Sequence, residues 1–98
     1  MYFVIFGTDK PGTAQQRRES LNDVVSYMRD HPDHPDVTVH CAGPTIDDRG
    51  NINGTLNVIE APSLEVAQAF LADNPLQKLG LLEDASVRQL DWKTGRPD

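Results

Sequence analysis

The sequence predicts a single α+β domain whose elements follow the order β-α-β-β-α-β. Three observations predict this class. Four short segments are continuously apolar or alternate between apolar and polar residues, as strands do, at residues 1–6, 37–42, 54–60 and 84–92. Segments with the apolar period of a helix follow the first and the third strand. The length of 98 residues supports one two-layer core, so we expect one domain over residues 1–98.

The first strand is an apolar run rich in strand formers, which is typical of a central strand buried on both faces. Gly7 is expected to end it, and a turn rich in Pro and Gly follows. A helix is expected over residues 14–29, until Pro32 and Pro35 prevent its continuation. Its apolar stripe consists of Leu21, Val24, Val25 and Met28.

The two middle strands are joined by a hairpin-like connection at residues 47–51. In the first of these strands, Val39 and Cys41 fall on one side and His40 on the other. Gly43 and Pro44 are expected to close it. Because Cys41 stands among valines, we expect its thiol to be buried and unreactive.

The second helix begins after Ser63, a favourable N-cap, and ends at the segment Asp73-Asn74-Pro75. Residues 76–81 are a short helical or coil segment before the last strand. Right-handed, short connections then favour the ferredoxin-like arrangement, a four-stranded antiparallel sheet with both helices on one face. Successive side chains of a strand point to opposite faces of the sheet, and both sets contain apolar residues. The face without helices should therefore also be covered. A homodimer that packs its open sheet faces together is the simplest solution.

Composition excludes several classes of function. The net charge of −6 disfavours nucleic acid and anionic membranes as partners. We expect a cytoplasmic protein, because no segment approaches the ~20 apolar residues of a spanning helix or has a signal-peptide core. The lone Cys41 excludes an internal disulfide and a cysteine-based zinc site. His31 and His34 could bind a metal ion, but a solvated acidic turn is the stronger interpretation, so we expect no metal and no cofactor.

Several short motifs follow one another along the chain, each at one position. They are the loop of residues 7–12, Arg17, Ala42-Gly43-Pro44 with Asp47-Asp48 and Gly50, Gly54-Thr55, Ser63-Leu64-Glu65, and Ala69-Phe70 to Asn74-Pro75 with Gly80. In this order the sequence resembles the YciI-like (YCII-related) family of small bacterial proteins over nearly the whole chain. The resemblance implies a dimeric ferredoxin-like α/β barrel and, for an enzyme, isomerase or lyase chemistry by proton transfer or elimination on a compact polar or aromatic small molecule.

The chain departs from the catalytic pair that the resemblance implies. The family's histidine position is Val24 here, and its aspartate position is Asn74. Valine has no proton to transfer, whereas an amide can orient a ligand or stabilise negative charge but cannot act as a base. His40 either replaces the missing base or, more simply, lies in the dimer interface. Two hypotheses stay open: an enzyme with a remodelled site, or a binding or interaction module without catalysis.

Three further residues are candidates for substrate binding. Arg17 either clamps an anionic ligand or forms a surface ion pair with Asp9 or Glu19. Asp9 either lines a ligand cleft or is an ordinary turn residue. Asp73 replaces the missing carboxylate only if the end of the second helix shifts in register, because adjacent helical residues point about a hundred degrees apart.

Overall fold

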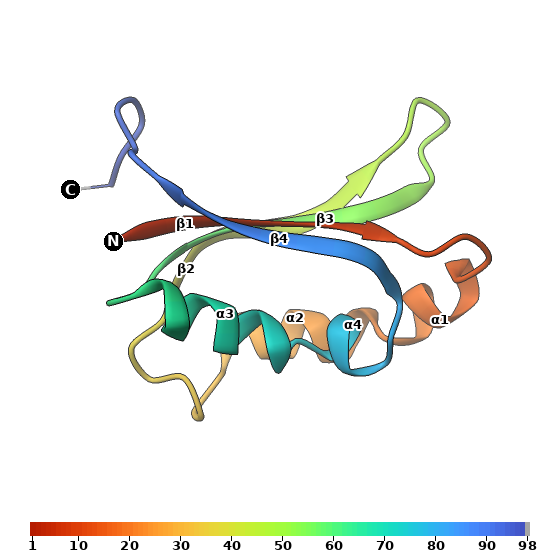
Figure 1. The fold of residues 1–98 in the computed structure, drawn as a ribbon. Coiled ribbons are helices and arrows are strands. Elements are labelled where there is room, and N and C mark those ends of the chain that lie inside the picture. Colours follow the sequence, from red (N-terminus) through yellow and green to blue (C-terminus); the bar gives the residue numbers. More distant parts are fainter. Residues whose placement is uncertain (98) are drawn as a thin grey trace.

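The computed structural model describes residues 1–97. Its elements are β1 (Tyr2–Asp9), α1 (Ala14–Glu19), α2 (Leu21–Arg29), β2 (Thr38–Ile46), β3 (Ile52–Glu60), α3 (Leu64–Ala72), α4 (Pro75–Lys78) and β4 (Leu82–Leu90). The strands form one antiparallel sheet in the order β2-β3-β1-β4, and the helices all lie on one face of it (Figure 1). The predicted ferredoxin-like fold is therefore confirmed. Within residues 1–97 no helix is long and apolar enough to cross a membrane.

The core lies between the sheet and the helices. Phe3 and Ile5 of β1 and Ile59 of β3 are fully buried beneath Ala67 and Phe70 of α3. A second apolar cluster lies beneath α4 and consists of Val24, Leu76, Leu81 and Leu82. The alternation of side chains along each strand then places the other half of every strand on the opposite face, which no helix covers.

The first helical segment differs from the prediction, because it is two helices rather than one. Ser20 separates α1 from α2. Its hydroxyl donates to the Arg17 carbonyl at 3.1 Å, the group that a continuous helix would pair with the Leu21 N–H. The residues next to Ser20 in the sequence include no glycine or proline that would predict this break. Arg17 is the buried residue of the short helix α1.

The first three strands are longer than predicted, whereas β4 has the predicted length but begins and ends two residues earlier. β1 continues through Gly7 to Asp9, and β2 continues through Gly43 and Pro44 to Ile46. Proline is tolerated there because β2 is an edge strand.

An irregularity in β2 corrects the predicted side-chain pattern of that strand. The pairing with β3 skips from Val39 to Cys41, so one extra residue, His40, is accommodated. Val39 stays opposite Ile59 on the helix side, but Cys41 moves opposite Val58 on the open side of the sheet. The prediction of a buried Cys41 is wrong, because the thiol is exposed in the single chain.

Candidate functional site

A cavity of about 630 Å³ lies between α2 and the strands β2 and β3. Strand residues such as Ala42, Pro44 and Thr55 form its floor. Its wall is the apolar stripe predicted for the first helical segment, namely Leu21, Val24, Val25 and Met28. Leu21 is 41% exposed and Val25 is 37% exposed, so much of this apolar wall faces solvent. An open cavity with such a wall is suited to the apolar part of a small ligand.

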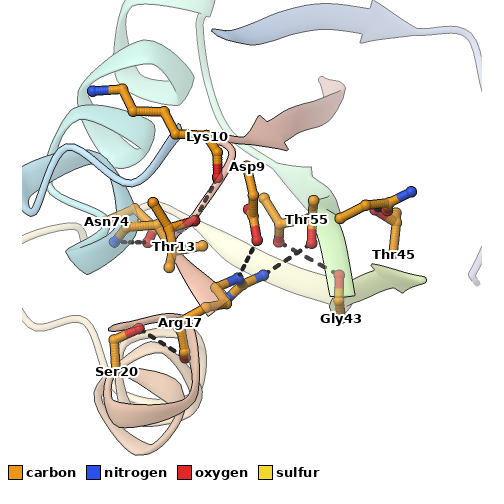
Figure 2. A network of polar contacts seen from close by, with 12 residues as sticks. Asp9, Lys10, Thr13, Arg17, Ser20, Gly43, Thr45, Thr55 and Asn74 are labelled. Carbon is orange, nitrogen blue, oxygen red and sulfur yellow. Dashed lines mark hydrogen bonds and ion pairs between the residues drawn. The ribbon is translucent and has the colours of Figure 1, made fainter. Parts of the chain in front are cut away.

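Arg17 is the charged residue at one end of the cavity, and only 3% of it is exposed. Its Nε donates to Asp9 Oδ2 at 3.2 Å, and one terminal nitrogen donates to the Gly54 carbonyl at 2.9 Å (Figure 2). The close approach of β3 to β1 at this point requires glycine, since a Cβ on Gly54 would collide with the Gly7 carbonyl oxygen. The sequence left open whether Arg17 pairs with Asp9 or binds a ligand; the pair forms, but it is buried rather than on the surface.

Asp9 belongs to the same arrangement. Its side chain is 8% exposed, and only one carboxylate oxygen meets Arg17. The other oxygen, Oδ1, is buried without a hydrogen-bond partner among residues 1–97. The two contacts to Asp9 and Gly54 use part of the Arg17 guanidinium, which has five N–H donors. The rest of the guanidinium can therefore serve a ligand in the cavity.

Asn57 is a cavity residue that the sequence analysis missed. It is 1% exposed, and neither its amide oxygen nor its amide nitrogen has a partner among the described residues. The alternation in residues 54–60 did show Thr55 and Asn57 on one side of the strand. A polar residue of a half-buried strand is normally assigned to the solvent side, whereas here this side faces the helices. Only the topology identifies Asn57 as a cavity residue.

The ionisable side chains in the cavity lining are all basic. Arg17, Arg29 and His31 line it, and within residues 1–97 no Asp or Glu does. The imidazole of His31 is held by the backbone, with one ring nitrogen 2.9 Å from the Tyr27 carbonyl oxygen and the other 2.9 Å from that of Val37. The cavity can therefore attract an anion, but it presents no carboxylate that could remove a proton from a ligand.

The two positions that the resemblance assigns to a catalytic pair, Val24 and Asn74, lie at the edge of this cavity or outside it. Val24 is 8% exposed and packs against Leu76, Leu81 and Leu82. Asn74 is 1% exposed, and its Oδ1 accepts from the Leu76 N–H at 2.9 Å as the N-cap of α4. Its Nδ2 is buried without a partner among residues 1–97. Asn74 is not part of the cavity lining, so its side chain is placed primarily to begin α4.

His40 and Asp73 lie apart from Arg17. His40 is on the open side of the sheet, where its Nε2 is 3.0 Å from Glu60 Oε1 and its ring is 5.6 Å from those of Tyr2 and Trp92. Asp73 is 44% exposed, and its Oδ2 is 2.7 Å from His34 Nε2. The structure thus brings Arg17 and Asp9 together and leaves His40 and Asp73 in two other environments.

Comparisons with known proteins agree with this fold. The profile of the YCII-related domain matches residues 1–93. The structure is similar to that of 5-chloro-2-hydroxyhydroquinone dehydrochlorinase from Burkholderia phenoliruptrix, solved with 2,5-dihydroxybenzoquinone; identity is 27%, coverage 97% of this chain and 96% of that one, and TM-score 0.77. No curated protein matches the sequence.

Two other solved structures share the fold. A NIPSNAP domain protein from Burkholderia xenovorans is 14% identical, with a TM-score of 0.55 and coverage of 99% of this chain and 98% of its own. A protein from Agrobacterium tumefaciens is 19% identical, with a TM-score of 0.55 and coverage of 98% and 96%. The domain match over residues 1–93 decides the assignment: the chain belongs to the YCII-related family.

Proposed function

We propose that the cavity binds a compact, planar organic anion. The observation that carries this proposal is the buried Arg17 in a cavity that Arg29 also lines and whose described lining contains no carboxylate. An arginine fork suits a carboxylate or another ionised oxygen pair, and the apolar wall of α2 suits the face of a ring. The volume of about 630 Å³ is in the range of small-molecule sites.

The similarity to the dehydrochlorinase supports the same class of ligand. That protein was solved with 2,5-dihydroxybenzoquinone. A hydroxyquinone is a vinylogous acid, so it is a flat anion at neutral pH. It combines the two properties that this cavity would select, a negative charge for Arg17 and a ring for the apolar wall of α2.

The test uses two variants that differ only at Arg17. Asp9→Asn removes the counter-charge, so Arg17 should attract an anion more strongly than in the wild-type protein. Asp9→Asn combined with Arg17→Met leaves no charge in this pair. A charge-assisted hydrogen bond contributes about 1.5–3 kcal/mol, so the double variant should bind 2,5-dihydroxybenzoquinone at least ~10-fold more weakly than Asp9→Asn. Titration calorimetry measures this difference, and equal affinities in the two variants would contradict the proposal.

A second candidate function is catalysis, an isomerisation or elimination on such a ligand. The observation that favours it is the 27% identity to a dehydrochlorinase over 97% of the chain. Asn74 and His40, the catalytic residues expected from the sequence, lie outside the cavity lining, and the proposed mechanism assigns no step to them. Basic groups would instead stabilise the enolate or phenolate of the ligand while the proton goes to solvent.

The pH profile separates binding alone from this catalysis. In this mechanism solvent hydroxide or the ligand's own ionisation supplies the deprotonation. The rate of chloride release from a chlorinated hydroxyhydroquinone should then rise with pH, without an inflection from the titration of a base on the protein. A bell-shaped profile would contradict this mechanism. If the protein binds the ligand but releases no chloride, only the binding function is supported.

We also propose that the open sheet face is the interface of a homodimer. Apolar side chains on this face, such as Phe6 at 44% and Leu56 at 37% exposure, would leave water when two faces pack together. Phe6 and Leu56 lie directly opposite each other in the pairing of β1 with β3. These two side chains therefore form one apolar patch on this face.

A further inference from the structure

We propose that Asn57 determines ligand specificity, and that it selects an aromatic anion that also carries an un-ionised hydroxyl group. This inference rests on the proposed function, since it names a second feature of the same ligand. Arg17 would bind the anionic group, and the side-chain amide of Asn57 would bind the hydroxyl. The geometry that points to this role is a buried amide in the cavity lining that the fold itself leaves unsatisfied.

The surroundings of Asn57 offer it no polar partner in the sheet. It lies between Ile5 of β1 and Ala42 of β2, whose side chains have no polar atoms. Its oxygen and its nitrogen are both buried without a hydrogen bond among residues 1–97. Burial of an unpaired amide is costly, so such a group is explained by a partner that the protein chain does not supply.

The other two buried polar side chains of the cavity lining, Thr55 and Arg17, each have a partner in the described chain. The Thr55 hydroxyl donates to the Gly43 carbonyl at 3.4 Å, and Arg17 holds Asp9 and Gly54. Within the described residues, Asn57 is the one side chain for which both polar atoms are buried and unpaired. Asn57 thus offers a ligand a buried amide oxygen that accepts hydrogen bonds and a buried amide nitrogen that donates them.

This pair of atoms restricts the chemistry of the ligand. The amide oxygen needs a donor and the amide nitrogen needs an acceptor. A carboxylate or a fully ionised hydroxyquinone has acceptors only, so it would leave the amide oxygen of Asn57 unpaired. A neutral phenolic hydroxyl both donates and accepts, and two adjacent hydroxyls satisfy both atoms together. A hydroxylated aromatic acid fits Arg17 and Asn57 at once.

The experiment compares two ligands that share the anionic group. Benzoate has the carboxylate and the ring, and 3,4-dihydroxybenzoate adds the hydroxyls. We expect the wild-type protein to bind 3,4-dihydroxybenzoate at least ~10-fold more tightly than benzoate, and Asn57→Leu to abolish that preference while changing benzoate affinity little. Thr55→Val is the matched control, because its hydroxyl is already paired, and it should keep the ratio of the two Kd values.

The Tm of Asn57→Leu distinguishes a ligand-binding role of Asn57 from a structural one, because the two roles predict changes of opposite sign. Asn57→Leu removes an unpaired buried amide, so its Tm should rise by about 4 °C or more. A lower Tm would assign Asn57 to the fold and overturn the proposal. Asn57→Ala, which removes the same two atoms with less volume, gives the same ligand comparison if leucine disturbs the packing.

The outcomes also separate this inference from the proposed function. If the wild-type protein binds both ligands and Asn57→Leu weakens both equally, or neither, the role of Asn57 is wrong while the anion site stands. If the double variant at Asp9 and Arg17 fails to weaken either ligand, or the wild-type protein binds neither, the anion site is wrong and the inference falls with it.

Discussion

Arg17 and Asp9 form an ion pair in a place where neither charge is well solvated, with 3% and 8% of the side chains exposed. The removal of one member of such a pair leaves the other as an uncompensated buried charge. The loss of one side chain alone should therefore destabilise the fold more than the loss of both.

Arg17→Met alone should lower the free energy of unfolding by about 3–5 kcal/mol. The double variant with Asp9→Asn should lose clearly less, because no unpaired charge remains. Lys93→Met is the control, since its contact with Asp91 joins two side chains that are both 81% exposed and should contribute little. Chemical denaturation of the wild-type protein, the two single variants, the double variant and the control measures these differences; additive effects of Arg17→Met and Asp9→Asn would contradict the coupling.

Tyr27 is a second residue whose environment has a measurable consequence. Its hydroxyl donates to the Phe70 carbonyl at 2.6 Å, and burial, followed by the negative charges of Asp73 and Asp33, raises the pKa of its phenol. The folded protein therefore keeps the proton at a pH where the unfolded chain, with a pKa of about 10, has lost it.

Stability should accordingly be constant with respect to Tyr27 below about pH 10 and fall as the pH rises above it. Tyr27→Phe should lose about 1 kcal/mol at neutral pH with the hydrogen bond. It should also show a smaller alkaline decrease than the wild-type protein in denaturation midpoints measured between about pH 8 and 11. An alkaline decrease identical in both proteins would disprove the role of Tyr27.

At the scale of elements, α2 packs one edge of its apolar stripe on α4 and exposes the other edge to the cavity. Val24 lies in the cluster with Leu76, Leu81 and Leu82, whereas Val25 is 37% exposed. A histidine at Val24 would therefore enter an apolar cluster with no polar partner from these neighbours.

Val24→His, which introduces the histidine that the resemblance implies at this position, should lower stability by about 1–3 kcal/mol and confer no turnover. Val25→His, one position further on the same helix, is the matched control and should change stability little because its side chain stays in contact with water. Denaturation midpoints and chloride release measure the two effects. A Val24→His protein that is stable and active would contradict the assignment of Val24 to an apolar cluster without a catalytic role.

The elements also show what the sequence could and could not predict. The order of strands and helices follows from local periodicity, and the Arg17–Asp9 pair was one of the alternatives. The insertion of His40 was not predictable, because an irregularity depends on the pairing of two strands rather than on either one. Asn57 was missed for a related reason. The sequence shows that it lies on the same side of its strand as Thr55, but which side the helices cover is a property of the assembled sheet.

At the scale of the whole molecule, the helices cover one face of the sheet and leave the other open (Figure 1). His40, Cys41 and Phe6 all lie on that open face. The proposed cavity is on the helix side, so dimer formation and ligand binding should be separable by substitution.

Phe6→Glu should convert the proposed dimer to a monomer, because a charge placed in an apolar interface loses its water. Leu79→Glu is the control, since Leu79 is 59% exposed but belongs to the end of α4 rather than to the sheet. Sedimentation equilibrium distinguishes the two species. A wild-type monomer, or a Phe6→Glu dimer, would contradict the interface.

The most direct measurement is a crystal structure of the protein grown with 2,5-dihydroxybenzoquinone. The ligand should lie in the cavity between α2 and the β2–β3 strands, with an ionised oxygen within hydrogen-bond distance of the Arg17 guanidinium and its ring against Val25. A ligand bound on the open sheet face, or in the cavity without contact to Arg17, would contradict the proposed anion site.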